Sequence, residues 1–131
     1  KIYDDLGVEF TENNGAGSFI VRTNISTVGS GDFVQGAVLD TFNGSRQILL
    51  SWHNGGGGIQ SVTIPADPKS QNWLSMILSS TTQEEELTKG DIDRDGDLDL
   101  LLGTTWLKND GGTWSPFTSP VASATAEATT G

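Results

Sequence analysis

Short runs of apolar, β-branched and aromatic residues alternate with clusters of Gly, Asn, Asp and Pro along most of this chain. No window of helical length carries an apolar stripe with a period of about 3.6 residues, which an amphipathic helix requires. Runs of this kind, bounded by turn-forming residues, are typical of β-strands. The pattern therefore predicts an all-β fold, with strands at residues 18–23, 33–39, 46–53, 58–64, 73–79, 97–103, 105–108 and 113–118.

Segments rich in Gly, Asn or Pro separate several of these strands, at residues 29–32, 54–58, 65–68 and 109–112. Gly supplies positive φ and Pro presets φ, as tight chain reversals require. We therefore expect most neighbouring strands to pair as antiparallel hairpins. Residues 82–87 leave two alternatives open, because the three glutamates at 84–86 suit either a helical turn or a polar loop.

Two apolar triplets lie 52 residues apart, at 48–50 and 100–102, and the same offset superimposes Gly44 on Gly96. Continuous apolar runs indicate strands that are covered on both faces of a sheet. A Trp follows each triplet, Trp52 in the first copy and Trp106 in the second. We predict an internal repeat, residues 33–64 and 87–118, that forms two four-stranded antiparallel sheets. Such sheets would be like propeller blades, but too few to close a propeller.

The length and net charge of the chain limit its number of domains and the classes of partner that it can bind. The 131 residues suit a single domain, here residues 1–118, followed by a Ser/Thr/Ala-rich tail at 119–131. The net charge of -10 opposes binding to nucleic acid and to anionic membranes, and no apolar run reaches the roughly 20 residues of a membrane-spanning helix. The chain has no Cys, so bound calcium, and not a disulfide, would stabilise a secreted form.

An aspartate-rich segment carries the strongest chemical signal. Asp91, Asp93, Asp95 and Asp99 occupy positions 1, 3, 5 and 9 of a loop that has Gly96 at position 6. Calcium takes six to eight oxygen ligands, and a tight loop presents alternate side chains toward one centre. Carboxylates this close repel one another unless a cation offsets their charge, which favours a calcium site over a solvated acidic turn. Mg²⁺ fits less well, because it demands a smaller octahedral shell.

The remaining loop residues have predicted roles as well. Asp97, at position 7, offers its backbone carbonyl as a further oxygen ligand, and Asp99 closes the site. Ile92 and Leu98 are expected to face away from the ion and to anchor the loop to the core. An EF-hand would place a Glu at position 12, where this chain has Leu102 in an apolar strand, so the EF-hand class is excluded.

The segment 91–103 resembles the FG-GAP/VCBS repeat family, whose blades carry D-x-D-x-D-G-x-x-D between two strands, as in integrin α-subunit propellers and secreted bacterial proteins. The close similarity covers residues 90–114, and a weaker one covers 34–64. Family members have several blades, whereas this chain holds about two. The resemblance implies binding of Ca²⁺ at one set of residues: Asp91, Asp93, Asp95, Asp97 and Asp99.

The first copy of the repeat lacks these ligands. The residues opposite the four spaced aspartates are Leu39, Thr41, Asn43 and Gln47, and Asp40 is the only acidic residue of that segment. Because Asp40 falls opposite Ile92 and not opposite a ligand, we predict that residues 39–47 bind no metal.

The sequence gives little support for any catalytic residue. His53 is the single histidine and has no nucleophile motif beside it. The adjacent glutamates at 84–86 are more typical of a solvated surface than of a glycosidase carboxylate pair. The sequence therefore predicts that the protein is not an enzyme.

Two further groups of residues bear on partners and location. The four tryptophans suit either core packing or a platform on which sugar rings stack; they are Trp52, Trp73, Trp106 and Trp114. Asn24 and Asn43 begin N-glycosylation sequons, which are consistent with an extracellular glycoprotein.

Three functions remain open from the sequence. The first is a non-catalytic, calcium-stabilised extracellular structural or interaction module. It would form a homo-oligomer or fibre if the tail at 119–131 adds as a strand to a neighbouring subunit, although the tail also suits pairing with its own sheet. The second is a carbohydrate-binding module that uses the tryptophans, with glycans as partners. The third is a fragment of a larger polysaccharide-processing propeller.

Overall fold

A computed structural model describes residues 9–26, 33–53, 58–81 and 86–118. These residues contain no helix, which confirms the predicted all-β class. Ten strands are described: β1 (Phe10–Asn13), β2 (Phe19–Arg22), β3 (Phe33–Phe42), β4 (Ser45–His53), β5 (Ile59–Thr63), β6 (Leu74–Ser79), β7 (Leu87–Gly90), β8 (Asp99–Leu102), β9 (Thr105–Asp110) and β10 (Thr113–Thr118). Among these residues there is no helix that is long and apolar enough to cross a membrane.

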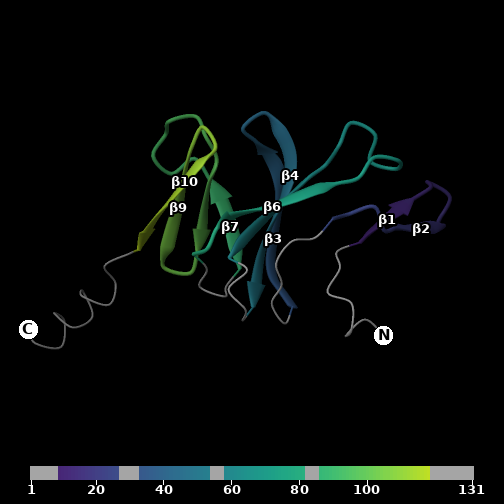
Figure 1. Ribbon diagram of the computed structural model, residues 1–131, viewed down its shortest axis with the longest axis horizontal. Coiled ribbons are helices and arrows are strands. Elements are labelled where there is room, and N and C mark those ends of the chain that lie inside the picture. Colours follow the sequence, from purple (N-terminus) through teal and green to yellow (C-terminus); the bar gives the residue numbers. More distant parts are fainter. Residues whose placement is uncertain (1–8, 27–32, 54–57, 82–85, 119–131) are drawn as a thin grey trace, which may run out of the picture.

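The strands form two four-stranded sheets and one hairpin (Figure 1). The first sheet has the order β3-β4-β5-β6, the second has the order β7-β8-β9-β10, and β1 pairs with β2. Every strand pair is antiparallel, and each strand pairs with its neighbour in sequence. The predicted pair of four-stranded antiparallel sheets is therefore confirmed, and the described strands do not close into a barrel or propeller.

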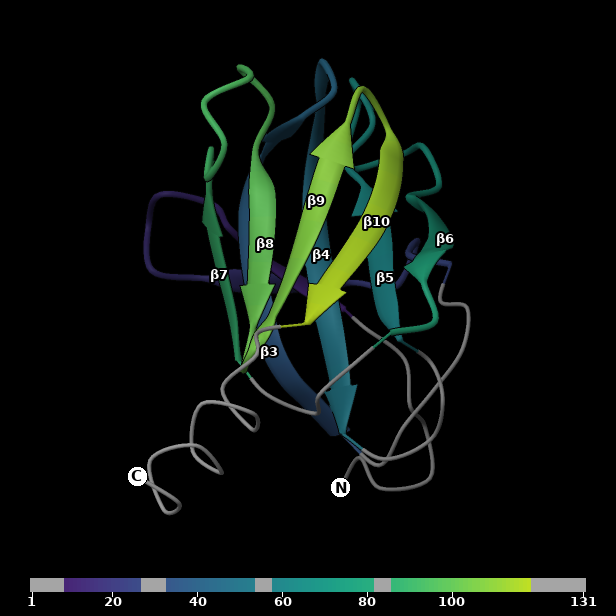
Figure 2. The same ribbon diagram turned by 90° about the vertical axis from the view of Figure 1, so that its left-hand side faces the viewer.

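The two sheets stack face to face in the same strand order, so that β3 contacts β7 at one side and β6 contacts β10 at the other (Figure 2). The main hydrophobic core lies between them and includes Phe42 and Leu49 from the first sheet and Leu100, Leu102 and Leu107 from the second. Close approach requires Gly36, where a Cβ would lie 2.7 Å from the backbone nitrogen of Leu87.

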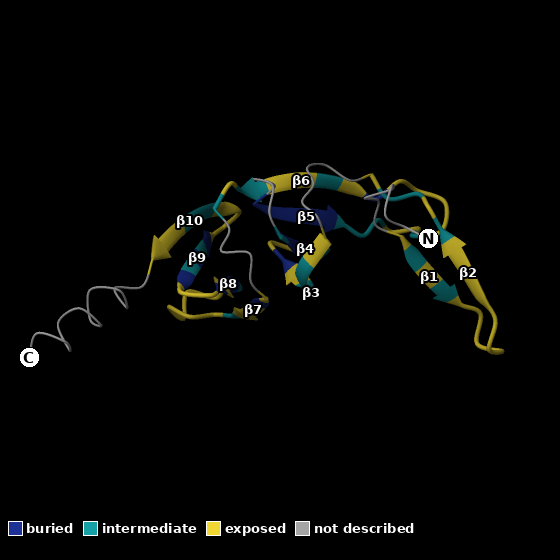
Figure 3. Ribbon diagram, turned by 90° about the horizontal axis from the view of Figure 1, so that it is seen from below, coloured by how far each residue is buried: buried dark blue, intermediate teal, exposed yellow. Residues whose placement is uncertain are grey.

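A second apolar cluster covers the other face of the first sheet. Leu50 and Trp52 of β4 pack there with Val62 and Trp73. The N-terminal segment lies over this cluster, since Phe10 stacks on Trp73 with ring centroids 4.6 Å apart. Leu49 and Leu50 therefore point to opposite covered faces, as the apolar triplet of the first copy predicts. The neighbouring strand β5 is buried along most of its length (Figure 3).

The same prediction is wrong for the second sheet. Leu100 and Leu102 are fully buried against the first sheet, but Leu101 between them is 42% exposed. Successive side chains of a strand project to opposite faces, and neither apolar cluster of the described residues includes Leu101. An apolar triplet alone does not tell whether a second layer is present.

Several strand boundaries also differ from the prediction. The pattern did not identify β1 and β7, and the strand expected from Asp97 begins at Asp99. Leu87 opens β7, so this end of the 82–87 stretch is a strand, while residues 82–85 lie outside the described residues. The first sheet continues past residue 64 into β6.

The two tryptophans that follow the triplets are not equivalent. Trp52 lies in the same strand as its triplet, β4, whereas Trp106 lies in the strand that follows its triplet, β9. The alignment of the triplets themselves agrees with the topology, because β4 and β8 are each the second strand of their sheet.

Candidate metal centre

The aspartate loop, residues 91–98, joins β7 to β8 at the end of the second sheet. Two residues within it have positive φ, Arg94 at 64° and Gly96 at 97°. A left-handed backbone is accessible to Gly at little cost, and these two residues allow the loop to fold back on itself. The spaced aspartates are thereby directed toward a common region.

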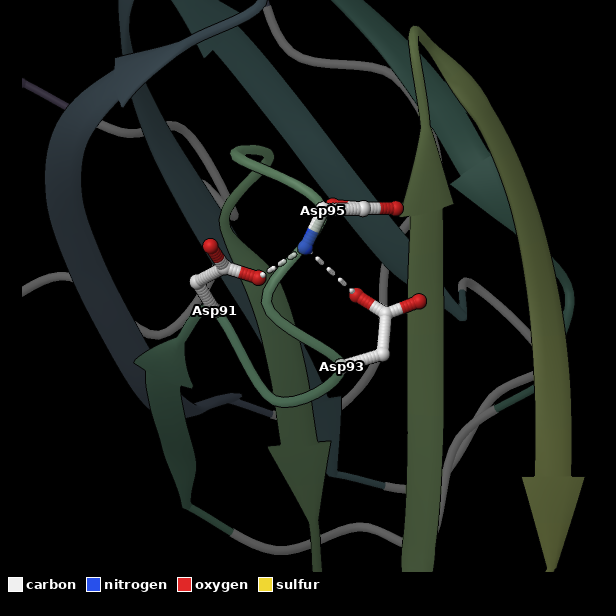
Figure 4. A group of neighbouring side chains, drawn as sticks. All are labelled: Asp91, Asp93 and Asp95. Carbon is white, nitrogen blue, oxygen red and sulfur yellow. Dashed lines mark hydrogen bonds between the residues drawn. The ribbon is translucent and has the colours of Figure 1, made fainter.

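Asp91, Asp93 and Asp95 each offer a carboxylate oxygen, and these three atoms lie within 4.8 Å of one another (Figure 4). Backbone amides hold the carboxylates in place, because the Asp95 N–H donates to Asp91 Oδ1 at 3.0 Å and to Asp93 Oδ1 at 3.4 Å. Gly96 N–H donates to the other oxygen of Asp91 at 2.9 Å. All three residues are exposed, so an ion from solvent can reach them.

A second group adjoins the first and shares Asp95 with it. It consists of Asp95, Asp97 and Asp110, again with one oxygen of each within 4.8 Å. The turn after β9 is held against the loop because Gly111 N–H donates to Asp97 Oδ2 at 2.8 Å. Together the two groups could hold a metal ion, and they add Asp110 to the residues predicted from the sequence.

Sequence reasoning missed Asp110 because it identified residues 109–112 only as a turn. The available signal is the arrangement of neighbouring hairpins: in an antiparallel sheet, the loop between β7 and β8 and the turn between β9 and β10 lie at the same end. An acidic residue in one turn can therefore approach acidic residues in the other.

Asp99 holds a different position from the other aspartates. It is fully buried, and its Oδ2 accepts the N–H of Ile92 at 3.0 Å while its Oδ1 accepts the N–H of Asn109 at 2.9 Å. Its carboxylate thus ties the start of the loop to β9, and it is not in either of the two carboxylate groups. Because each oxygen keeps a second lone pair, a ligand role for Asp99 stays a prediction.

The two apolar residues of the loop behave differently. Leu98 packs against the core between the sheets, as predicted. The prediction that Ile92 anchors the loop is wrong, because its side chain is 41% exposed. The backbone N–H of Ile92, bound to Asp99, provides the anchor in place of its side chain.

Asn109 is a buried residue that the sequence did not single out. Its Nδ2 donates to the carbonyl of Leu98 at 3.1 Å and to Asn43 Oδ1 at 3.0 Å, and its Oδ1 accepts the N–H of Gly112 at 2.9 Å. One side chain therefore connects the aspartate loop, the turn after β9 and the first hairpin turn of the other sheet.

Lys108 supplies positive charge beside the carboxylates. Its Nζ lies 2.6 Å from Asp93 Oδ2 and 3.5 Å from Asp95 Oδ2. The hydrogen bond from Lys108 lowers the pKa of Asp93 below its ordinary value, and the same contact raises the pKa of Lys108. Both groups are therefore charged near neutral pH, and one lysine leaves an excess of negative charge around Asp91, Asp93 and Asp95.

The aligned segment of the first copy is a tight hairpin. Asn43 and Gly44 have φ of 51° and 80°, and positive φ at both positions is the requirement of a two-residue type I′ turn. Asp40 forms an ion pair with Lys89 of the second sheet, which lowers the pKa of Asp40. That residues 39–47 bind no metal stays a prediction.

The two sequons have different surroundings. Asn24 donates from Nδ2 to the carbonyls of Pro68 at 3.0 Å and of Gln71 at 2.6 Å, so both amide hydrogens are in use. Attachment of a sugar would remove one of these hydrogens. Asn43 is exposed in its turn, and its Oδ1 is the atom that Asn109 contacts.

The structure does not assemble the other candidate residues into one site. Trp52 and Trp73 are only 3% and 4% exposed in the core, so a sugar platform of all four tryptophans is wrong. His53 stacks on Phe33 at the end of β4, with centroids 4.5 Å apart. Glu84 and Glu85 lie outside the described residues.

Comparisons with protein-family models, with curated proteins and with solved structures return no match. The resemblance of the aspartate loop to FG-GAP/VCBS repeats therefore stays a prediction from the spacing of its residues.

Proposed function

We propose that this protein is a non-catalytic extracellular structural or interaction module that calcium stabilises. The observation that carries the proposal is the convergence of Asp91, Asp93 and Asp95 in a loop whose backbone is fixed by hydrogen bonds. Fixed carboxylates with surplus negative charge are costly without a cation, so the loop is suited to binding one.

The chemistry of the ligands favours calcium among common metal ions. Every candidate ligand is a carboxylate or carbonyl oxygen, a donor set that suits Ca²⁺, Mg²⁺ and Mn²⁺ and not the softer metals. Two adjoining groups supply five carboxylates, those of Asp91, Asp93, Asp95, Asp97 and Asp110. This number suits the larger and more flexible shell of calcium better than the compact octahedron of magnesium.

The proposed role of the ion is structural. It would bridge the aspartate loop and the turn that carries Asp110, and so connect the β7–β8 and β9–β10 hairpins of one sheet. An extracellular location fits this role, because extracellular calcium is abundant enough for sites of modest affinity. The chain has no Cys, so the ion would serve in place of a disulfide as a cross-link between hairpins.

Thermal unfolding in calcium and in excess chelator tests the proposal. Binding to the native state alone adds about 2.7 kcal/mol at a hundredfold excess over Kd, which corresponds to roughly 10 °C for a domain of this size. Asp95→Asn should remove most of this difference, since Asp95 belongs to both carboxylate groups. Glu9→Gln removes the same charge from an exposed residue and should leave the calcium effect intact. Equal melting temperatures in calcium and chelator would refute a stabilising ion.

Assembly by strand addition remains part of the proposal. In the two four-stranded sheets, β3, β6, β7 and β10 are the edge strands, and an exposed edge is a template for a strand of another chain. The proposed donor is the tail at 119–131, which lies outside the described residues. Deletion of residues 120–131 should reduce the particle size in light scattering, and unchanged assemblies would exclude the tail as donor.

The two other functions receive less support. Burial of Trp52 and Trp73 removes half of the predicted sugar platform. A fragment of a polysaccharide-processing propeller would have its catalytic groups outside these residues, and the intact gene would decide that case.

A further inference from the structure

The β1–β2 hairpin is a sheet of only two strands, separate from the two larger sheets. A sheet of this size is marginally stable in water unless a third strand or another layer completes it. Its first strand is held against the rest of the molecule, because Phe10 stacks on Trp73 and Glu12 Oε1 lies 2.6 Å from Lys69 Nζ. β2 is therefore the outer strand of the hairpin (Figure 3).

β2 exposes three consecutive apolar side chains. Phe19, Ile20 and Val21 are 62%, 45% and 56% exposed. Because successive side chains of a strand alternate between its faces, both faces of the hairpin are apolar along this strand. Arg22 is the one charged residue of β2, and its guanidinium already binds Glu12 at 2.9 Å. The rest of β2 lacks the charges and prolines that commonly protect an edge strand.

The edges of the two larger sheets are less open to an added strand. β3 and β7 approach each other, and Lys89 Nζ of β7 donates to the carbonyl of Leu39 in β3 at 2.9 Å. Directly before β6, the backbone of Trp73 already bonds to the segment 24–26. β10 contains Pro116, which has no N–H to donate to a neighbouring strand. Among the described strands, β2 is thus the edge best suited to accept another strand.

The sequence of the tail has the pattern of a strand that fits such an edge. Between residues 121 and 129 every even-numbered position is Ala, and the odd-numbered positions are Val121, Ser123, Thr125, Glu127 and Thr129. Strict alternation of this kind is typical of a β-strand with two different faces. A face of small Ala side chains can lie beside the larger Phe19 and Val21 without crowding, while Val and Thr on the other face favour an extended backbone.

The position of β10 indicates which copy of β2 the tail meets. Figure 1 places β10, which leads into the tail, at the opposite end of the molecule from the β1–β2 hairpin, with the first sheet between them. To reach β2 of its own chain, the tail would have to run back along the whole molecule. The β2 strand of a second copy can instead lie directly beside the end of β10.

We propose that residues 121–129 of one copy pair with β2 of the next copy as the third strand of its hairpin. This inference names the acceptor edge for strand addition, and it rests on that part of the proposed function. Backbone hydrogen bonds supply the affinity of an added strand, and contacts of its alternate side chains supply the specificity. Because donor and acceptor lie at opposite ends of each copy, the contact is heterologous and builds a fibre, not a closed dimer.

Light scattering of full-length variants tests β2 as the acceptor. Val21→Lys puts a charge on the proposed edge and should raise the protein concentration needed for assembly about tenfold or more. Leu74→Lys makes the same change at an exposed residue of β6 and should leave assembly unchanged. Assemblies that persist in Val21→Lys, but not after deletion of residues 120–131, would refute β2 as the acceptor and leave the proposed strand addition intact. Assemblies that survive both changes would refute strand addition itself.

Cross-linking keeps the test independent of any destabilisation by Val21→Lys. Because the chain has no Cys, full-length Val21→Cys can be mixed with chains that carry a single Cys in the tail, at Ala122, Ala124, Ala126 or Ala128. At least one mixture should yield a disulfide-linked dimer of the two chains on mild oxidation, whereas Leu74→Cys in place of Val21→Cys should yield none. No mixed dimer at any of the four positions, an equal yield with Leu74→Cys, or a disulfide that closes within one chain carrying both substitutions would overturn the proposed pairing.

Discussion

Asp99 and Asp95 have the same side chain but different surroundings, which separates their roles. Asp99 is fully buried and accepts two backbone hydrogen bonds, whereas Asp95 is exposed and belongs to both carboxylate groups. Buried donors that lose their acceptor are costly whether or not a metal is present. At the scale of single residues, we therefore assign a structural role to Asp99, which holds the loop against β9, and ion binding to Asp95.

The substitution Asp99→Asn tests this division. An amide has one accepting oxygen, so either Ile92 or Asn109 would lose its partner. We expect a loss of about 1–3 kcal/mol in the free energy of unfolding, measured by urea denaturation in excess chelator. Asp95→Asn should cause little loss under the same conditions. Equal losses in the two variants would contradict the assigned roles.

Acid should weaken the fold through carboxylates outside the metal loop. Lys69 and then Arg22 lower the pKa of Glu12 below its ordinary 4.5, and Lys89 lowers the pKa of Asp40 below its ordinary 3.8. A depressed pKa in the folded state contributes stability above the unfolded pKa, and this stability is lost as pH falls through the folded pKa. The melting temperature in chelator should thus begin to fall below about pH 4.5. The effect should be modest because these groups are only partly buried, and solvent screens their ion pairs.

Asp40→Asn provides the matched comparison for this pH dependence. It removes the partner of Lys89, so the melting temperature should fall less between about pH 6 and about pH 3 than in the wild type. Glu86→Gln removes the same charge from an exposed residue and should keep the wild-type slope. An identical slope in Asp40→Asn would show that the ion pair contributes nothing.

At the scale of single residues, the sequence alone predicted part of the metal centre. The spacing of Asp91, Asp93, Asp95 and Asp97 is a property of one short loop, so it can be read from neighbouring residues. Asp110 and Asn109 join the centre through contacts between hairpins, and these depend on strand register and not on local spacing. That part required the three-dimensional structure.

Alternation of side chains along β8 gives a prediction at the scale of the element. Leu102 is fully buried between the sheets, while Leu101 beside it is 42% exposed. Leu102→Ala should lower the free energy of unfolding by about 2–5 kcal/mol, because it leaves a cavity in the core. Leu101→Ala should cost less than about 1 kcal/mol, because this side chain is already partly in solvent. Similar losses for the two variants would mean that Leu101 is as well covered as Leu102.

Strand prediction succeeded where local composition was decisive. β4, β5 and β6 have apolar or β-branched residues between turn signals, and each lies close to its predicted position. β1 and β7 have the sequences Phe-Thr-Glu-Asn and Leu-Thr-Lys-Gly, which carry little apolar pattern. These two strands form because a partner strand is adjacent, and the sequence of the segment alone does not contain that information.

At the scale of the whole molecule, two stacked sheets carry an acidic centre at one end of the second sheet, and this centre is the basis of the proposed calcium binding.

Isothermal titration of Ca²⁺ into chelator-stripped protein tests the central claim most directly. We predict one ion per chain with a dissociation constant of about 1 mM or lower, and clearly weaker binding by Asp95→Asn, because both carboxylate groups share that residue. Absence of binding at millimolar calcium, or wild-type affinity in Asp95→Asn, would contradict the account.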